Sequence, residues 1–314
     1  FGTGLHNNFE LNGRVSNIAS DGYIDRASTN MFGYFFNANY VRETTLIKLL
    51  AFGGKEKTYQ AWNGLEDPDK LKNDRTFNSA GMYTDEFGNI QFYSNENDNY
   101  WQNHFQLHWS ENWSENWVSN IALHYTTGKG YFEQYKEDQK FSSYNLPNFG
   151  GNIRTDLVRK RWLDNDFFGT TFSLNYKTQA TNVLFGGAVN RYLGNHFGEV
   201  IWTQYYVPNS NRYYDNFGNK DDINAYAKLS QNLTSKLNLY VDLQYRMTFY
   251  EATSVKFDDV NDTFKFFNPI VGFLFINVIL PSLILRFKPS MTLLLPYENE
   301  RALISKILSG IVLF

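Results

Sequence analysis

The chain has 314 residues, of which 29 are basic and 32 acidic, so its formal net charge is −3. A nucleic-acid-binding protein usually has a basic excess or patch, and this balance argues against one. Cysteine is absent, which excludes disulfides, thiolate metal sites and a cysteine nucleophile. Aromatic residues form 18% of the chain, yet the mean hydropathy is −0.47. That mixture suits a surface with one apolar side and one wet side.

The predicted elements are about ten β-strands, and the clearest lies near the end of the series. From Leu237 to Phe249 apolar side chains alternate with polar ones, among them Asp242, Gln244 and Arg246. A strand that crosses a bilayer needs about 9–11 residues, whereas an ordinary strand has about 5–6. In chain order, the other predicted strands lie at residues 8–19, 32–40, 45–54, 101–109, 117–125, 168–176, 182–193, 222–233 and 263–275.

The connections between these strands alternate in length. Short polar turns are predicted near residues 42–44, 110–116, 178–181 and 232–236. Long loops are predicted at 54–98, 128–165, 194–221 and 251–262, with a shorter one at 20–29. Short periplasmic turns and long extracellular loops are typical of outer-membrane proteins, which close because lipid cannot satisfy a free sheet edge. The sequence therefore predicts an all-β fold, an antiparallel transmembrane β-barrel. A soluble sandwich or propeller is the alternative, and it fits the strand lengths less well.

Several short blocks carry a resemblance to a known family. They lie at residues 20–26 (SDGYIDR), 53–64 (GGKEKTYQAWNG), 124–131 (HYTTGKGY), 190–198 (NRYLGNHFG), 241–246 (VDLQYR) and 266–269 (FFNP). Together they resemble the barrel of TonB-dependent outer-membrane receptors, in the Bacteroidetes branch, over about residues 1–273. The resemblance implies a 22-stranded barrel closed by an N-terminal plug, with energy from the TonB–ExbB–ExbD system. It also implies active import of a ferric siderophore, cobalamin, haem or a glycan.

The chain departs from that family in two ways. It begins at Phe1 without an initiator Met or a signal peptide, and no plug or TonB box is recognised, so we expect residues 1–275 to be a partial barrel of about ten strands. Residues 276–314 form a hydrophobic tail in which the alternation stops. A shifted reading frame, a membrane-spanning helix weakened by Pro281 and Arg286, and a divergent pair of lipid-facing strands are three accounts of it.

Aromatic residues in the predicted loops are the candidate ligand contacts, because rings bury area at low entropic cost and stack on sugars or siderophore rings. Packing of the loops on themselves is the alternative interpretation. Four loop cations, Arg75, Lys129, Arg154 and Arg212, could attract an anionic ligand. The aromatic candidates are Tyr59, Trp62, Tyr131, Tyr135, Trp202, Tyr205 and Tyr206.

A second group of polar side chains is predicted to line the lumen. His104 and His108 lie on one strand, and the turn near Trp113 places His124 diagonally across from His104. Imidazoles this close could bind a metal, but no third ligand is fixed by spacing, so we expect polar lumen lining and no metal site. The complete set of predicted lumen-facing residues is His104, His108, His124, Asp242, Gln244 and Arg246.

The sequence contains no motif that indicates catalysis or a cofactor. Gly128-Lys-Gly130 lacks the spacing of a phosphate-binding loop, and no nucleophile motif occurs, so we expect neither an enzyme nor a bound cofactor. The predicted partners are outer-membrane lipid, lipopolysaccharide and a small nutrient ligand, and the predicted location is the outer membrane. A passive outer-membrane pore or an adhesin-like barrel without a plug is the alternative function.

Overall fold

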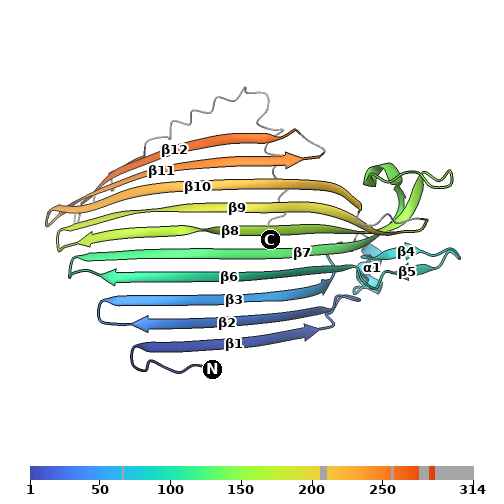
Figure 1. Cartoon of the computed structure of the whole chain (residues 1–314), viewed down its shortest axis with the longest axis horizontal. Helices are drawn as coiled ribbons and strands as arrows, with labels where there is room; N and C mark the ends of the chain where they lie inside the picture. The colour runs from blue at the N-terminus through green and yellow to red at the C-terminus, as the bar shows by residue number, and fades with distance from the viewer. Residues whose placement is uncertain (66, 206–210, 256–257, 276–282, 287–314) are drawn as a thin grey trace.

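The computed structural model describes residues 1–65, 67–205, 211–255, 258–275 and 283–286. Its main feature is an 11-stranded antiparallel meander in the order β1-β2-β3-β6-β7-β8-β9-β10-β11-β12-β13, and β4 and β5 form a separate hairpin (Figure 1). The elements are β1 (Phe9–Ser20), β2 (Thr29–Val41), β3 (Thr45–Tyr59), α1 (Pro68–Asn73), β4 (Met82–Thr84), β5 (Ile90–Phe92), β6 (Asn97–Asn112), β7 (Trp117–Lys140), η1 (Phe141–Tyr144), β8 (Arg154–Lys177), β9 (Thr181–Thr203), β10 (Asn211–Thr234), β11 (Leu237–Ser254), β12 (Val260–Phe275) and β13 (Leu283–Arg286).

This architecture confirms the predicted antiparallel fold, with all ten predicted strands in the sheet. Short turns lie at the left end of Figure 1 and the longer connections at the right end. The eleventh strand, β13, lies within the predicted tail and pairs with β12 from Ile270 to Phe273. The rest of the tail lies outside the described residues. Within them, no helix is both long and apolar enough to cross a bilayer.

The predicted loop lengths are wrong for the middle of the sheet. Residues 128–165 were expected to form a loop, but β7 continues to Lys140 and β8 starts at Arg154. Residues 194–221 are likewise mostly strand. Backbone pairing continues there although the apolar–polar alternation has ended. The connection at residues 60–96 remains long and contains α1 and the β4–β5 hairpin.

Side chains of the sheet alternate between two faces. On β7, Ile121, Leu123 and Tyr125 share what we call the apolar face, and Ala122 and His124 share the polar face. The register carries both faces across the sheet because paired residues lie on the same side. Exposed members of the apolar face are Phe9, Leu11, Val15, Phe36, Leu49, Leu107, Phe172, Phe185, Val189, Ile223, Leu243 and Tyr245.

The apolar band covers only the turn-side part of the long strands. β7 has 24 residues, yet its band extends only from Trp117 to Tyr125, close to the about 9–11 residues that cross a bilayer. Rings mark its turn-side border, where the centroids of Trp117 and Tyr176 are 4.7 Å apart. Beyond the band the same face becomes charged, and Lys129 Nζ lies 2.8 Å from Asp164 Oδ2.

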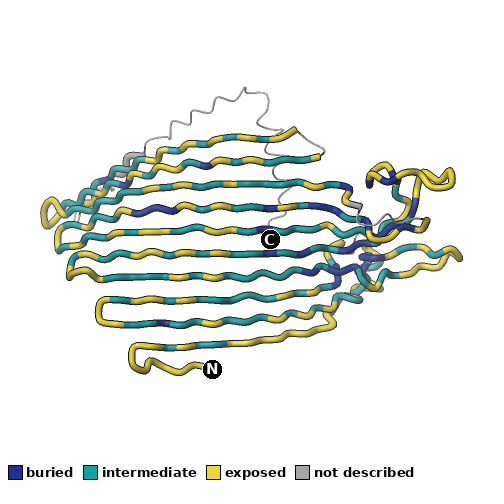
Figure 2. The backbone as a smooth tube through the Cα atoms, in the orientation of Figure 1, coloured by how far each residue is buried: buried dark blue, intermediate teal, exposed yellow. Residues whose placement is uncertain are grey.

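The sheet has little conventional core, and most of its strand residues are exposed or half-buried (Figure 2). Many of the buried residues lie at the loop-side end, on the right of Figure 2. One apolar cluster there brings η1 and the following loop against β8, β9 and β10. Its buried residues are Phe141, Tyr144, Leu146, Leu157, Val200 and Tyr213.

Candidate ligand site at the loop-side end of the polar face

The six predicted lumen-facing residues all lie on the polar face. His104 pairs with Thr126 and His108 with Ala122 in the β6–β7 register. On β11, Asp242, Gln244 and Arg246 occupy alternate positions of the same face, which continues through β8, β9 and β10. The structure therefore places these six side chains on one side of the sheet.

Each of the three histidines is engaged by an uncharged neighbour. His104 Nδ1 lies 2.9 Å from Thr126 Oγ1, and His124 Nε2 lies 2.8 Å from Asn190 Oδ1. His108 is similarly 3.0 Å from Gln106 Oε1. Among the described residues no group of three or more His, Cys, Asp or Glu side chains could hold a metal.

Charged residues of β10 and β11 form two ion pairs on the polar face. Lys228 Nζ lies 3.1 Å from Asp242 Oδ2, and Asp242 is 3% exposed. Arg246 makes the second pair, 2.6 Å from Asp222 Oδ2, and Gln244 donates to the Asp242 carboxylate. Each of these charges has an oppositely charged partner, so this part of the polar face leaves no charged group free to bind a ligand.

The predicted aromatic ligand contacts do not form one surface. Tyr59 is 7% exposed and its hydroxyl donates to the carbonyl oxygens of Ala80 (3.1 Å) and Tyr93 (2.8 Å). This corrects the prediction for Tyr59, which anchors the segment 60–96 and offers no ring to a ligand. Tyr131 lies on the apolar face, where its ring is 4.4 Å from that of Trp162.

The remaining predicted rings are divided among three places. The Tyr135 ring lies 4.4 Å from Tyr83 and 6.0 Å from Trp202, and its hydroxyl donates to Asp156. Trp62 is 56% exposed and touches Phe132 edge-on. Tyr205 packs against Phe141 and Phe149, and Tyr206 lies outside the described residues.

Three of the four predicted loop cations are already paired with acids. Lys129 pairs with Asp164, Arg154 with Asp138, and Arg212 with Glu199 and Asp215. Arg75 is exposed in the segment 60–96. These three cations therefore attract an anionic ligand only weakly, because each already forms an ion pair with a carboxylate.

A different set of cations lies on the polar face near the loops, and sequence reasoning missed it. We call Phe132, Lys136, Arg159, Arg161 and Tyr214 the basic–aromatic site. The β7–β8 and β8–β9 registers place Lys136, Arg159 and Arg161 on one face. Within the described part of the chain, none of these cations has a carboxylate oxygen within 4.0 Å.

The two arginines of this site are held by neutral groups. Arg159 donates to Gln134 Oε1 (2.9 Å) and to the Tyr144 hydroxyl (3.1 Å). Arg161 Nε donates to the Tyr214 hydroxyl at 3.2 Å, and its guanidinium lies 5.4 Å from the Phe132 ring centroid. Guanidinium groups fixed in this way keep their charge available to a carboxylate, phenolate or phosphate.

The segment 60–96 is attached to β7 by a buried polar network. Glu133 is 2% exposed and accepts hydrogen bonds from the Tyr93 hydroxyl (2.5 Å) and Asn95 (2.6 Å). Lys160 Nζ lies 3.5 Å from the other carboxylate oxygen of Glu133, Oε2. Burial raises the pKa of Glu96, and burial together with the Glu133 carboxylate raises the pKa of Tyr93. This end of the sheet is thus ordered by polar contacts.

Comparison with solved structures identifies the fold. The chain is similar to the ferric citrate transporter FecA, with a TM-score of 0.62, 11% identity and coverage of 90% of this chain and 39% of that one. For the siderophore receptor PiuA from Acinetobacter baumannii, the TM-score is 0.61, the identity 9%, and the coverage 90% and 45%. For the ferric-catecholate import receptor Fiu from E. coli K12, the TM-score is 0.57 and the identity 11%, with 88% of this chain and 49% of that one covered.

The likeness at these identities is one of fold. The chain spans less than half the length of each of these three proteins. No protein-family profile and no curated protein matches the sequence. The names of these three structures describe two receptors and a transporter.

Proposed function

We propose that this chain forms barrel wall and loops of a TonB-dependent outer-membrane receptor that imports a scarce nutrient, with a ferric siderophore as the leading class. The observation that carries the proposal is the long antiparallel meander with one apolar and one polar face, which shares its fold with ferric-ligand receptors over about nine-tenths of its length. The Bacteroidetes branch and a boundary after residue 275 remain predictions.

The two faces fit this role in different ways. The apolar band contacts lipid, and the aromatic rings at its turn-side border lie at the membrane–water interface. The polar face lines the lumen, against a plug on which TonB–ExbB–ExbD acts. The segments 60–96 and 141–153 lie at the extracellular end and capture the ligand.

The basic–aromatic site favours an anionic ligand that also carries rings. Arg159 and Arg161 supply fixed guanidinium forks that suit carboxylates and phenolates. Phe132 and Tyr214 provide rings beside the same charge. A ferric siderophore with acidic oxygen donors matches this combination better than a neutral glycan does.

Tryptophan fluorescence of the refolded chain in detergent tests the proposal. The chain is titrated with a panel of ferric siderophores, cobalamin, haem and oligosaccharides. We expect saturable binding of an acidic ferric siderophore, weakened about tenfold or more in Arg161→Gln because a charge-assisted hydrogen bond is lost. Arg191→Gln, which alters an ion pair on the apolar face, is the matched control and leaves binding unchanged. Binding of none of these compounds, together with open-pore conductance in planar bilayers, would overturn the proposal in favour of a passive pore.

A further inference from the structure

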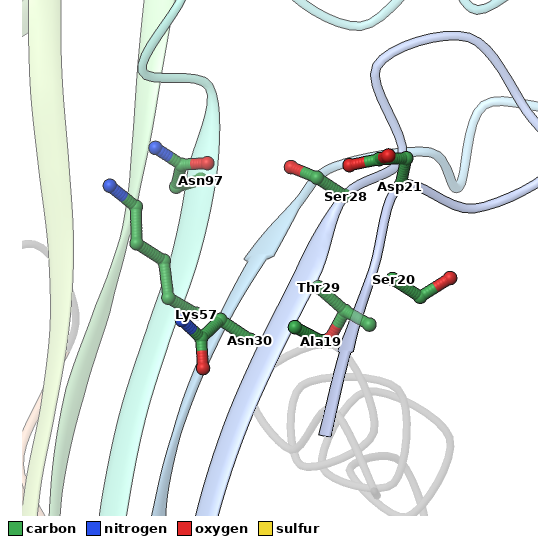
Figure 3. Close-up of a pocket in the computed structure, with 8 residues that line it drawn as sticks. All are labelled: Ala19, Ser20, Asp21, Ser28, Thr29, Asn30, Lys57 and Asn97. Atoms are coloured by element: carbon green, nitrogen blue, oxygen red, sulfur yellow. The ribbon is translucent and has the colours of Figure 1, made fainter. Parts of the chain in front are cut away.

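The pocket shown in Figure 3 lies at the loop-side ends of β1, β2 and β3 and has a volume of about 180 Å³. Its lining comes from both faces of the sheet, since Asn30 pairs with Lys57 on the apolar face while Thr29 pairs with Thr58 on the polar face. Its polar groups therefore do not form one binding surface. Polar groups that do share one face, and that no contact described above uses, lie on β9 and β10 beside the basic–aromatic site.

His196 on β9 differs from the other histidines of the polar face. His104, His108 and His124 each have a hydrogen-bond partner, whereas within the described residues no group bonds to the imidazole of His196. The side chain is half-buried. A neutral imidazole has one donor nitrogen and one acceptor nitrogen, so His196 keeps an acceptor for a ligand.

The register places His196 next to Arg161 of the basic–aromatic site. Arg161 pairs with Gly198, and His196 precedes Gly198 by two residues on the same face of β9. Such diagonal neighbours lie about 7–8 Å apart, a spacing that one small ligand can bridge. Arg161 is exposed, and in the described part of the chain only its Nε atom donates a hydrogen bond, to Tyr214. Its two terminal nitrogens can therefore receive a carboxylate.

Asn216 on β10 is the cross-strand partner of His196. Its Oδ1 atom is buried and has no hydrogen-bond partner among the described residues, which is unfavourable until a donor reaches it. Tyr214 precedes Asn216 by two residues, and its ring lies against Gly198, where an added Cβ would be 2.4 Å from the ring. We call His196 and Asn216 the acceptor pair. An aromatic ring, a guanidinium group and two neutral acceptors thus lie side by side on the polar face.

We propose that the acceptor pair recognises a hydroxyl group of the ligand, and that the ligand is an aromatic hydroxy acid. Its carboxylate binds Arg161, its ring packs against Tyr214, and its hydroxyl group donates to the acceptor pair. The proposal rests on the proposed function and narrows its ligand to acids that carry a hydroxyl group beside a carboxylate. His196 and Asn216 are then specificity-determining residues, because a ligand without the hydroxyl group leaves their acceptors unpaired.

Binding of two matched probes by the full chain, refolded in detergent, tests the proposal. Mandelate and phenylacetate have the same ring and the same carboxylate, and only mandelate has a hydroxyl group on the carbon between them. Isothermal titration calorimetry measures both affinities. We expect the parent chain to bind mandelate about five- to tenfold more tightly than phenylacetate, which is the gain from one neutral hydrogen bond.

Four variants divide the site into its parts. His196→Phe keeps a ring but removes the acceptor, so we expect it to bind the two probes equally, with the phenylacetate affinity unchanged. His196→Gln restores an acceptor and should keep part of the preference, and Asn216→Leu should lose part of it. Arg161→Gln should weaken both probes equally, because both carry the carboxylate. The matched control is His108→Phe, since His108 lies on the same face and already bonds to Gln106; it should leave the preference unchanged.

Equal affinity of the two probes for the parent chain, or binding of neither, would overturn the proposal. So would a His196→Phe variant that binds both probes more weakly to the same extent, which would show a structural role for the imidazole. The siderophore titration of the same variants separates this proposal from the proposed function. Siderophore binding by a parent chain that does not distinguish the probes would overturn only the hydroxy-acid assignment. Discrimination between the probes without siderophore binding would overturn only the proposed function.

Discussion

The turn-side and loop-side halves of the same strands differ in how polar and apolar residues are distributed between the two faces. In the turn-side half of β7, Leu123 on the apolar face and His124 on the polar face follow strict alternation. In the loop-side half, Glu133 and Gln134 are successive residues on opposite faces, and both are polar and buried. The β7–β8 backbone ladder runs from Trp117 to Lys136 and resumes at Gln139 after a bulge. Alternation thus ends at the border of the apolar band, although the strand continues beyond it.

The largest expected effect comes from a charge in the apolar band. Leu123→Arg is expected to cost about 2–4 kcal/mol and to block insertion, because an arginine near the bilayer midplane loses its hydration. Ala122→Arg is the matched control, since its side chain points to the polar face one residue away. Urea titration of folding into lipid vesicles measures both. Equal losses in the two variants would show that the faces are assigned wrongly.

Removal of a buried acid in the loop-side half should be less costly. Glu133→Ala leaves the Tyr93 hydroxyl and Asn95 without their acceptor, at a cost of about 1–3 kcal/mol for buried polar groups. We expect the segment 60–96 to be cleaved faster in limited proteolysis while insertion is retained. The exposed Glu251→Ala on β11 serves as the control. Unchanged cleavage would contradict the anchoring role of Glu133.

Glycine is required on the polar face where β6 and β7 meet. A Cβ at Gly130 would overlap the Asn99 carbonyl oxygen and Tyr100, whereas one at Gly218 meets nothing within 4 Å. Gly130→Ala should therefore destabilise the chain by about 1–2 kcal/mol through overpacking. Gly218→Ala should be neutral or slightly stabilising. Thermal unfolding in detergent compares the two, and equal midpoints would contradict this close approach.

The smallest expected effect is on pH dependence. Because burial raises the pKa of Glu96, the folded chain keeps this proton at a pH where the unfolded chain has lost it. Stability from this group is complete below the ordinary carboxyl pKa and declines as the pH rises through the shifted value. Glu96→Gln should flatten that decline in proteolysis rates of the segment 60–96. A variant with the same pH profile as the parent would contradict the role of Glu96.

Much of the fold could be predicted because apolar and polar side chains alternate along the turn-side half of the strands. The alternation from Leu237 to Phe249 predicts most of β11, and short polar turns separate it from β10. The strand extensions beyond the band could not be predicted in the same way. Buried polar residues such as Glu133 and buried apolar residues such as Leu157 are mixed there without alternation, so the composition resembles that of a loop.

The candidate site was predictable only in part. The placement of His104, His108 and His124 on one face followed from the β6–β7 register, which the sequence of a short turn indicates. Arg159 and Arg161 lie in a segment that the sequence pattern predicts to be a loop, although their spacing of two residues would place them on one face of a strand. Tyr59 shows the opposite error, because a residue next to a loop can be buried by the loop itself.

We propose that lipid contacts only the turn-side half of the apolar face. The chain has no cysteine, so single cysteines can be placed along β7 from Trp117 to Lys140, labelled with a fluorophore and quenched from within the lipid. We predict strong quenching at Ile121, Leu123 and Tyr125 but not at the residues between them, and none after Lys129. Quenching without alternation, or quenching that continues to Lys140, would contradict this placement of lipid.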